Sequence, residues 1–148
     1  MPTALPPAAS DRAWFPLFAA WTIASISTLG ALFLGEVMGL APCVLCWYQR
    51  IFMFPLVLVL GAGLFPADPR AVRYALPLAL AGWLVAAYHL LLVSGFVPAS
   101  LVPCDASGVS CSEVTVRWLG FITIPLLSVA AFSLILLALV AALPRKHP

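Results

Sequence analysis

The sequence predicts an all-α protein, an integral membrane bundle of four helices with two outer-facing loops that carry cysteines. Composition is the first observation: 64% of the 148 residues are hydrophobic and 8% are charged, whereas soluble domains carry roughly 25% charged residues. The second observation is a mean hydropathy of +1.14, and the third is the presence of four apolar runs. Seven basic and five acidic side chains cannot cover a water-soluble fold. We therefore exclude a soluble enzyme, a coiled coil and a disordered tail.

The four apolar runs are predicted to be membrane spans, because a hydrocarbon core of about 30 Å requires about 20 apolar residues. The runs lie near residues 15–37, 46–65, 74–96 and 119–143. The first run is longer than the roughly 7 to 15 residues of a signal-peptide core, so we expect it to be retained. Because no polar stretch exceeds the size of a loop, residues 1–148 are expected to form a single four-span domain.

The basic residues near the span ends predict that both termini are cytoplasmic. Five of them then lie on the cytoplasmic side and two on the outer side: Arg12, Arg70, Arg73, Arg145 and Lys146 against Arg50 and Arg117. None of these residues forms a run or stripe that would bind a phosphate backbone, so we expect no nucleic-acid partner. In this orientation every cysteine lies on the outer side, where disulfides form and persist.

The four cysteines fall into two pairs, one in or beside each outer connection. Cys43 and Cys46 are separated by two residues where the second span begins, and a helix N-terminus favours the thiolate needed for exchange. Cys104 and Cys111 lie in the longer connection, among Pro, Ser and Gly residues, and are interpreted as an accessible disulfide. Static staples remain an alternative for both pairs. A zinc site with four thiolate ligands is another alternative.

Three ionisable residues are expected in the outer half of the bundle near the first cysteine pair. Arg50 follows Cys46 by four residues, which places it one turn deeper on the same helix face. It could stabilise a thiolate or an electron-rich oxygen, or extend to lipid headgroups. His89, within the third span, is a functional candidate or hydrogen-bonds a neighbouring span. Glu36 ends the first span on the same side.

These residues resemble the disulfide bond formation protein B family of membrane thiol:quinone oxidoreductases, especially its short-loop branch found in bacilli. The resemblance extends from about residue 14 to residue 143. It is carried by the segment CVLCWYQR at 43–50, His89, the cysteine loop 104–111 and the segment GFITIP at 120–125. The spacing of the second pair departs from the enterobacterial branch, whose loop is much longer. The identity of the partner is therefore the inference that the resemblance supports least.

The resemblance implies a bacterial inner-membrane enzyme that holds a quinone, either ubiquinone or menaquinone, near the outer leaflet. Its partner would be a thioredoxin-fold dithiol oxidase that introduces disulfides into exported proteins. Cys104 and Cys111 would form the partner-facing disulfide and Cys43 and Cys46 the quinone-facing one. Arg50 and His89 would contact the quinone. Glu36 matches an acidic residue of the short-loop branch, and no role comes with it.

The expected mechanism is a relay of thiol–disulfide exchange through mixed disulfides. The partner's thiolate attacks Cys104 and releases Cys111, which attacks Cys43 and frees Cys46 beside the quinone. One alternative is an enzyme like vitamin K epoxide reductase, although in that family the cysteine pair lies in the last span. The other is a non-catalytic four-span protein that binds metal or assists assembly.

Overall fold

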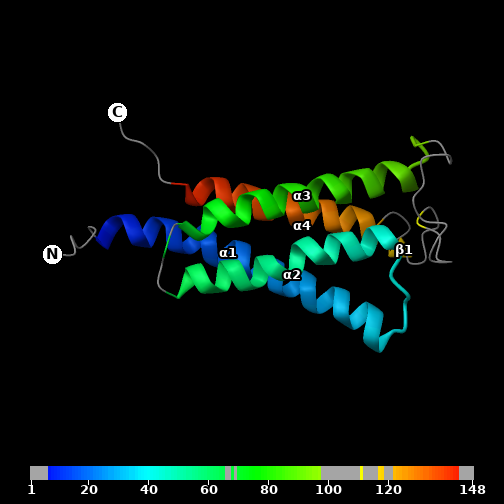
Figure 1. Cartoon of the computed structure of the whole chain (residues 1–148), viewed down its shortest axis with the longest axis horizontal. Helices are drawn as coiled ribbons and strands as arrows, with labels where there is room; N and C mark the ends of the chain where they lie inside the picture. Colours follow the sequence, from blue (N-terminus) through cyan, green and yellow to red (C-terminus); the bar gives the residue numbers. More distant parts are fainter. Residues whose placement is uncertain are drawn as a thin grey trace.

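The computed structural model describes residues 7–65, 68, 70–97, 111, 117–118 and 122–143. Four long helices make up most of this part (Figure 1): α1 (Pro7–Leu32), α2 (Val44–Leu64), α3 (Arg70–Val93) and α4 (Ile124–Ala142). A short π-helix, η1 (Phe33–Val37), continues α1. Two strands of two residues each, β1 (Arg117–Trp118) and β2 (Ile122–Thr123), pair antiparallel before α4.

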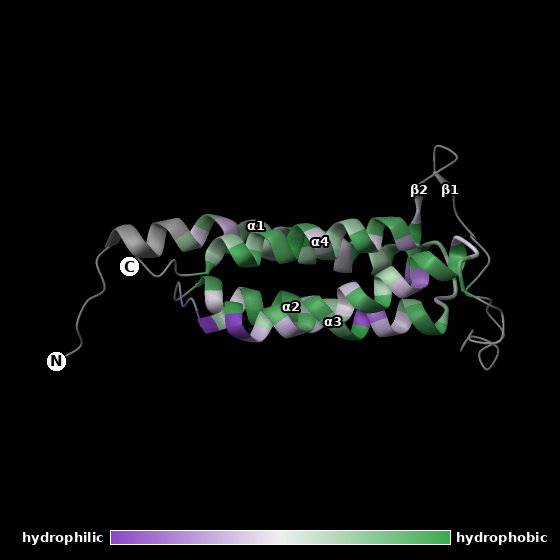
Figure 2. Cartoon of the chain, turned by 90° about the horizontal axis from the view of Figure 1, so that it is seen from above, coloured by the Kyte–Doolittle hydropathy of each residue, from purple (hydrophilic) through white to green (hydrophobic). Residues whose placement is uncertain are grey.

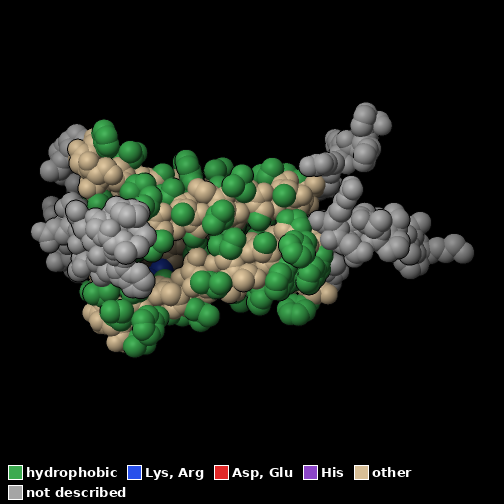
Figure 3. Space-filling view, turned by 180° about the vertical axis from the view of Figure 1, so that it is seen from behind, with side chains coloured by type: hydrophobic (Ala, Val, Ile, Leu, Met, Phe, Trp, Pro, Cys, Tyr) green, Lys and Arg blue, Asp and Glu red, His purple; other side chains and the backbone are tan. Residues whose placement is uncertain are grey.

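The helices confirm the predicted all-α architecture of four membrane-spanning segments. Each is long and apolar enough to cross a membrane, over Ala13–Val37, Val44–Leu64, Arg70–Val93 and Ile124–Ala142. Figure 2 shows hydrophobic residues along most of their length, and Figure 3 shows hydrophobic side chains over the helical part of one face. Large apolar side chains that are exposed in a single chain, such as Phe15, Leu58 and Leu137, are suited to contact with lipid.

Several helix ends differ from the hydropathy-based boundaries, including the starts of α1 at Pro7 and of α3 at Arg70, which lie before the expected residues 15 and 74. Local hydrogen bonds decide two other ends. α4 begins at Ile124, not at residue 119. Residues 117–118 pair with 122–123 instead, the Thr123 hydroxyl accepts from the backbone N–H of Leu126 at 3.4 Å, and Pro125 occupies the first turn. α3 ends at Val93, not at residue 96. Gly95 there adopts a φ of 79°, and Phe96 N–H bonds Leu91 C=O at 3.1 Å, which is a Schellman motif.

The helices pack in a ring in which α1 contacts α2 and α4, and α3 contacts α2 and α4. Phe132 of α4 is fully buried against Gly82 of α3, where a Cβ would lie only 2.3 Å from the Phe132 ring. Small residues such as this glycine allow membrane helices to approach closely. The Trp83 indole N–H also donates to the Ser133 hydroxyl at 2.9 Å, which joins α3 to α4.

The alternating direction of the helices brings the chemically interesting residues to one end of the bundle. η1, the start of α2, the end of α3 and the start of α4 all lie at this end (Figure 1). We call this the cysteine end, because Cys43, Cys46 and Cys111 lie there. The start of α1 and the end of α4 lie at the opposite end of the bundle.

Candidate functional site

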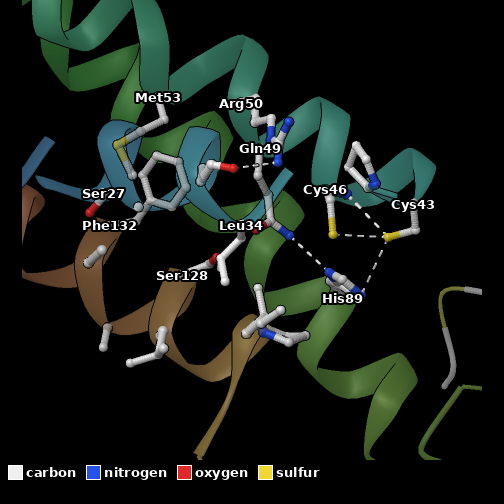
Figure 4. Close-up of a pocket in the computed structure, with 18 of the residues that line it drawn as sticks. Ser27, Leu34, Cys43, Cys46, Gln49, Arg50, Met53, His89, Ser128 and Phe132 are labelled. Carbon is white, nitrogen blue, oxygen red and sulfur yellow. Dashed lines mark hydrogen bonds between the residues drawn. The ribbon is translucent and has the colours of Figure 1, made fainter. Parts of the chain in front are cut away.

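The first cysteine pair lies at the N-terminus of α2. Cys43 is the N-cap residue, and its sulfur accepts from the backbone N–H of Cys46 at 3.4 Å. The two sulfur atoms are 3.1 Å apart, and both cysteines are free thiols (Figure 4). The helix start therefore holds the sulfurs in contact, so a disulfide can form or open with little movement of the backbone.

The surroundings of Cys43 favour its thiolate. The hydrogen bond from the Cys46 thiol lowers the pKa of Cys43 most, while burial opposes the shift, and the nearby His89 and the Cys46 backbone N–H lower the pKa further. Hydrogen bonds to a charged form stabilise that form, and a helix N-terminus adds a positive partial charge. These contacts therefore favour the thiolate form of Cys43, the sulfur that faces His89.

His89 comes from α3 and is held between the cysteine pair and a glutamine of α2. Its Nε2 lies 4.0 Å from the Cys43 sulfur, and its Nδ1 lies 3.0 Å from the amide nitrogen of Gln49 (Figure 4). Both side chains are buried, with 4% of His89 and 6% of Gln49 exposed. With the amide nitrogen of Gln49 toward Nδ1, the matching histidine tautomer carries its proton on Nε2. The opposite orientation of the amide would match a proton on Nδ1.

Gln49 was not among the residues that the sequence singled out. The available signal was its position three residues after Cys46, on the same helix face as that cysteine. Its importance depends on His89, which is 40 residues away in the sequence. Only the packing of α2 against α3 brings the two together.

Arg50 folds toward α1 within the bundle. Its Nη2 donates to the Ala31 carbonyl oxygen at 2.8 Å, and its guanidinium carbon lies 5.4 Å from the centre of the Trp47 ring. A Cβ added at Gly35 would lie 3.1 Å from Nη2, so the absence of a side chain at this position makes room for the arginine. Ala31 lies just before η1, and π-helical turns are frequent at functional sites. The chain thus uses Arg50 to join α2 to α1 beside the cavity.

A cavity of about 490 Å³ opens between the four helices at this level. Its lining is mostly apolar, and a few polar groups converge on it. Figure 3 shows a hollow near this end of the bundle with basic colouring inside it. The lining includes Ile23, Ser27, Leu34, Cys43, Cys46, Gln49, Arg50, Met53, His89, Cys111, Pro125, Ser128 and Phe132. An apolar cleft of this size with few polar groups is typical of a small-molecule site.

The predicted site residues are therefore largely brought together at the cysteine end. Cys111 is disulfide-bonded and 1% exposed, and it belongs to the same buried cluster as Cys43, Leu45 and Leu92. Because Cys43 and Cys46 are free, neither is its disulfide partner, and no cluster of four free thiolates forms in this structure. Cys104 lies outside the described residues. Glu36 lies in η1, is exposed, and is not part of the cavity lining among the described residues.

Comparison with known proteins finds a family and relatives that are all named for disulfide formation. The family model described as "Disulfide bond formation protein DsbB" matches residues 11–142. A "Probable disulfide formation protein" of Metapseudomonas resinovorans is 44% identical over 142 residues, covering 96% of this chain and 99% of the relative. "Disulfide bond formation protein C" of Bacillus subtilis (strain 168) is 46% identical over 123 residues, which cover 82% of this chain and 87% of the relative. A "Probable disulfide formation protein" of Coxiella burnetii is 40% identical over 119 residues, which cover 79% of this chain and 80% of the relative. No solved structure matches.

The match covers most of the chain and includes the helix start that holds the cysteine pair. Four helices able to cross a membrane and a thiol pair at a helix start, with Cys43 buried and Cys46 half-buried, agree with a membrane oxidoreductase of disulfide formation. The chain belongs to the disulfide bond formation protein DsbB family.

Proposed function

We propose that this protein is a membrane thiol:quinone oxidoreductase that reoxidises a thioredoxin-fold dithiol oxidase on the outer side of the bacterial inner membrane. The observation that carries the proposal is the shared cavity: the thiol pair, Arg50 and His89 all line one apolar space within the bundle. Exported proteins would acquire their disulfides from the partner. The N- and C-termini would be cytoplasmic, because five of the seven basic residues then lie on that side.

The residues around the cavity fit a quinone. The volume of about 490 Å³ lies within the range of roughly 300 to 1,000 Å³ for small-molecule sites, and the apolar lining suits a ring with a hydrocarbon tail. Arg50 and His89 are the groups that would bind the ring oxygens. A guanidinium has five N–H donors, so the bond from Arg50 to Ala31 leaves others for a ligand. A quinone, either ubiquinone or menaquinone, supplies an acceptor for two electrons and two protons.

The partner's electrons would enter at the second cysteine pair. A thiolate of the partner attacks Cys104, forms a mixed disulfide and releases Cys111 as a thiolate. Cys111 belongs to the same buried cluster as Cys43, which supports Cys43 as the next sulfur in the relay. Its attack forms a Cys111–Cys43 bond, breaks the Cys43–Cys46 bond and releases Cys46 as a thiolate into the cavity lining.

The second thiolate of the partner then completes its own disulfide and frees Cys104, which attacks Cys111 and releases Cys43. The products are a re-formed Cys104–Cys111 disulfide and a reduced Cys43–Cys46 pair that holds two electrons. The Nε2 of His89 lies 4.0 Å from the Cys43 sulfur, so a proton on this nitrogen would stabilise a negative charge on that sulfur. Loss of two electrons re-forms the Cys43–Cys46 bond.

Turnover with defined components tests the proposal. The purified protein in detergent is mixed with a reduced thioredoxin-fold oxidase and a soluble short-chain quinone, and quinone loss is followed by its absorbance. We expect continuous quinone reduction that requires both proteins and stops in Cys46→Ser. The proposal would be overturned if wild-type protein oxidised the partner at the same rate with and without quinone under anaerobic conditions.

A further inference from the structure

We propose that the reduced protein contains a binding site for one thiophilic divalent ion of the zinc class, formed by Cys43, Cys46 and His89. The site exists only in the reduced form, because a Cys43–Cys46 disulfide removes both thiolate ligands. The three residues come from two helices, since the cysteines begin α2 and His89 lies near the end of α3. An ion bound there would act as an inhibitor of the reduced enzyme.

The spacing of the three ligand atoms is close to what a zinc ion requires. The two sulfurs and a ring nitrogen of His89 all lie within 4.8 Å of one another. The sulfurs are 3.1 Å apart, and Nε2 is 4.0 Å from the Cys43 sulfur. With Zn–S near 2.3 Å and Zn–N near 2.0 to 2.1 Å, tetrahedral coordination needs about 3.8 Å between sulfurs and about 3.5 Å from sulfur to nitrogen. Side-chain shifts of less than about 1 Å therefore suffice.

The groups behind the histidine supply the support that metal-bound imidazoles normally have. A ligating histidine usually donates its other ring N–H to an oxygen, which fixes the tautomer and the ring orientation. Gln49 already lies 3.0 Å from Nδ1 and is buried with it. Rotation of its amide by half a turn presents the oxygen to Nδ1–H, and the Nε2 lone pair is then free to face the sulfurs.

Charge and ligand type decide which ion this site prefers. Two thiolates in an apolar setting carry an unfavourable charge, and a divalent cation brings the sum to zero. Soft sulfur ligands with an imidazole select zinc and its relatives over magnesium or calcium. Three protein ligands leave a fourth position open, as in catalytic zinc sites, and all three residues line the cavity.

Binding would change reactivity without any electron transfer. The ion takes the places of the thiol protons, which are released, and both sulfurs remain at the level of thiolate. Because each sulfur is then bonded to the ion, the pair cannot close to a disulfide until the ion leaves. Zinc should therefore slow reoxidation of the Cys43–Cys46 pair and leave the oxidised protein unaffected.

The test titrates reduced, detergent-solubilised full-length protein with Zn²⁺ against a chromophoric chelator, and with Cd²⁺ followed by thiolate-to-metal absorption. The double variant Cys104→Ser/Cys111→Ser serves as the background, since it leaves Cys43 and Cys46 as the chain's cysteines. We expect one ion per reduced chain and none after the pair is oxidised. Loss of a supporting group typically costs about 10- to 100-fold in metal affinity, which we expect for Gln49→Leu. His89→Ala should cost at least about 100-fold.

Two further variants keep the test decisive. His147→Ala removes the chain's other histidine and should leave the affinity unchanged. His89→Cys replaces the imidazole with a thiolate and should restore tight binding, which separates ligation from a folding defect. Absence of a stoichiometric ion in the reduced background, or an affinity that is the same in His89→Ala, would overturn the proposal. Quinone reduction in chelator-treated buffer is measured separately, so failure of metal binding leaves the proposed oxidoreductase function intact.

Discussion

Replacing Arg50 with lysine is the most informative single change at the cavity, because it keeps the charge and removes the planar guanidinium. The Arg50 Nη2 is bonded to the Ala31 carbonyl at 2.8 Å, and the group lies 5.4 Å from the centre of the Trp47 ring. A lysine ammonium carries all of its N–H donors on one nitrogen atom. It cannot maintain the bond to α1 and also direct a hydrogen bond at a ligand in the cavity.

The expected size of the effect follows from the loss of one charged hydrogen bond, which is worth roughly 1.5 to 3 kcal/mol. At 1.4 kcal/mol per decade this predicts an increase of about 10- to 150-fold in the apparent KM for a short-chain quinone. Exchange with the partner at Cys104 should stay near normal, because Arg50 takes no part in it. Steady-state kinetics measures both quantities on one preparation.

The control is Arg50→Met, which removes the charge as well and should raise the quinone KM at least as much as lysine does. An unchanged quinone KM in well-folded Arg50→Lys would refute the reasoning and would leave Arg50 with the structural role of joining α2 to α1. A parallel loss of partner exchange would also count against it, since the change would then act on the whole fold.

The remaining predictions address the packing around Gly35 and Gly82, the separate roles of the two cysteine pairs, and the orientation of the protein in the membrane. Gly35→Ala places a Cβ 3.1 Å from the Arg50 Nη2, so the quinone KM should rise in kinetic assays. Gly82→Ala places a Cβ 2.3 Å from the Phe132 ring and should lower stability to thermal unfolding by about 1 to 3 kcal/mol, as overpacking does. Cys104→Ser should block partner exchange yet retain quinone reduction by a small dithiol. A membrane-impermeant maleimide should label the reduced cysteines of intact cells.

The Gly82 prediction has a matched control variant, and each of the other predictions has an outcome that would count against it. Gly30→Ala adds a Cβ with nothing within 4 Å, so it should not lower stability, and an equal effect at Gly30 and Gly82 would contradict the packing argument. For Gly35→Ala, a normal quinone KM would show that Arg50 tolerates the added methyl group. Loss of small-dithiol activity in Cys104→Ser would make the relay order wrong. Labelling that requires permeabilised cells would reverse the proposed orientation.

Much of the architecture could be predicted from the sequence, because a bilayer imposes a length and an apolar composition on every span. The four helices, and the meeting of Cys43, Cys46 and Cys111 at one end, follow from that constraint. Hydropathy could not locate the start of α4 at Ile124, since the preceding residues are apolar as well. The Thr123 cap and the pairing of β1 with β2 decide that boundary instead.

The inner arrangement of the site was less accessible to sequence reasoning, because it depends on contacts between different helices. The spacing of the two residues predicted that Arg50 lies on the Cys46 face of the helix. It could not predict that Arg50 bonds to Ala31 of α1. His89 was a candidate from its depth in the span, whereas its contacts with Gln49 and Cys43 arise from the packing of α2 on α3. The widened turn of η1 beside Arg50 has no pattern in the sequence that periodicity could detect.

The central claim is that electrons from a partner dithiol pass through Cys43 and Cys46 to a quinone. An anaerobic stoichiometric reaction tests this most directly. Reduced thioredoxin-fold oxidase is added in excess over the protein but below the amount of quinone, and partner disulfides and reduced quinone are counted together. The account predicts one quinone reduced for each partner disulfide formed, and none with Cys46→Ser. Partner disulfides that accumulate beyond the amount of protein while the quinone stays oxidised would contradict it.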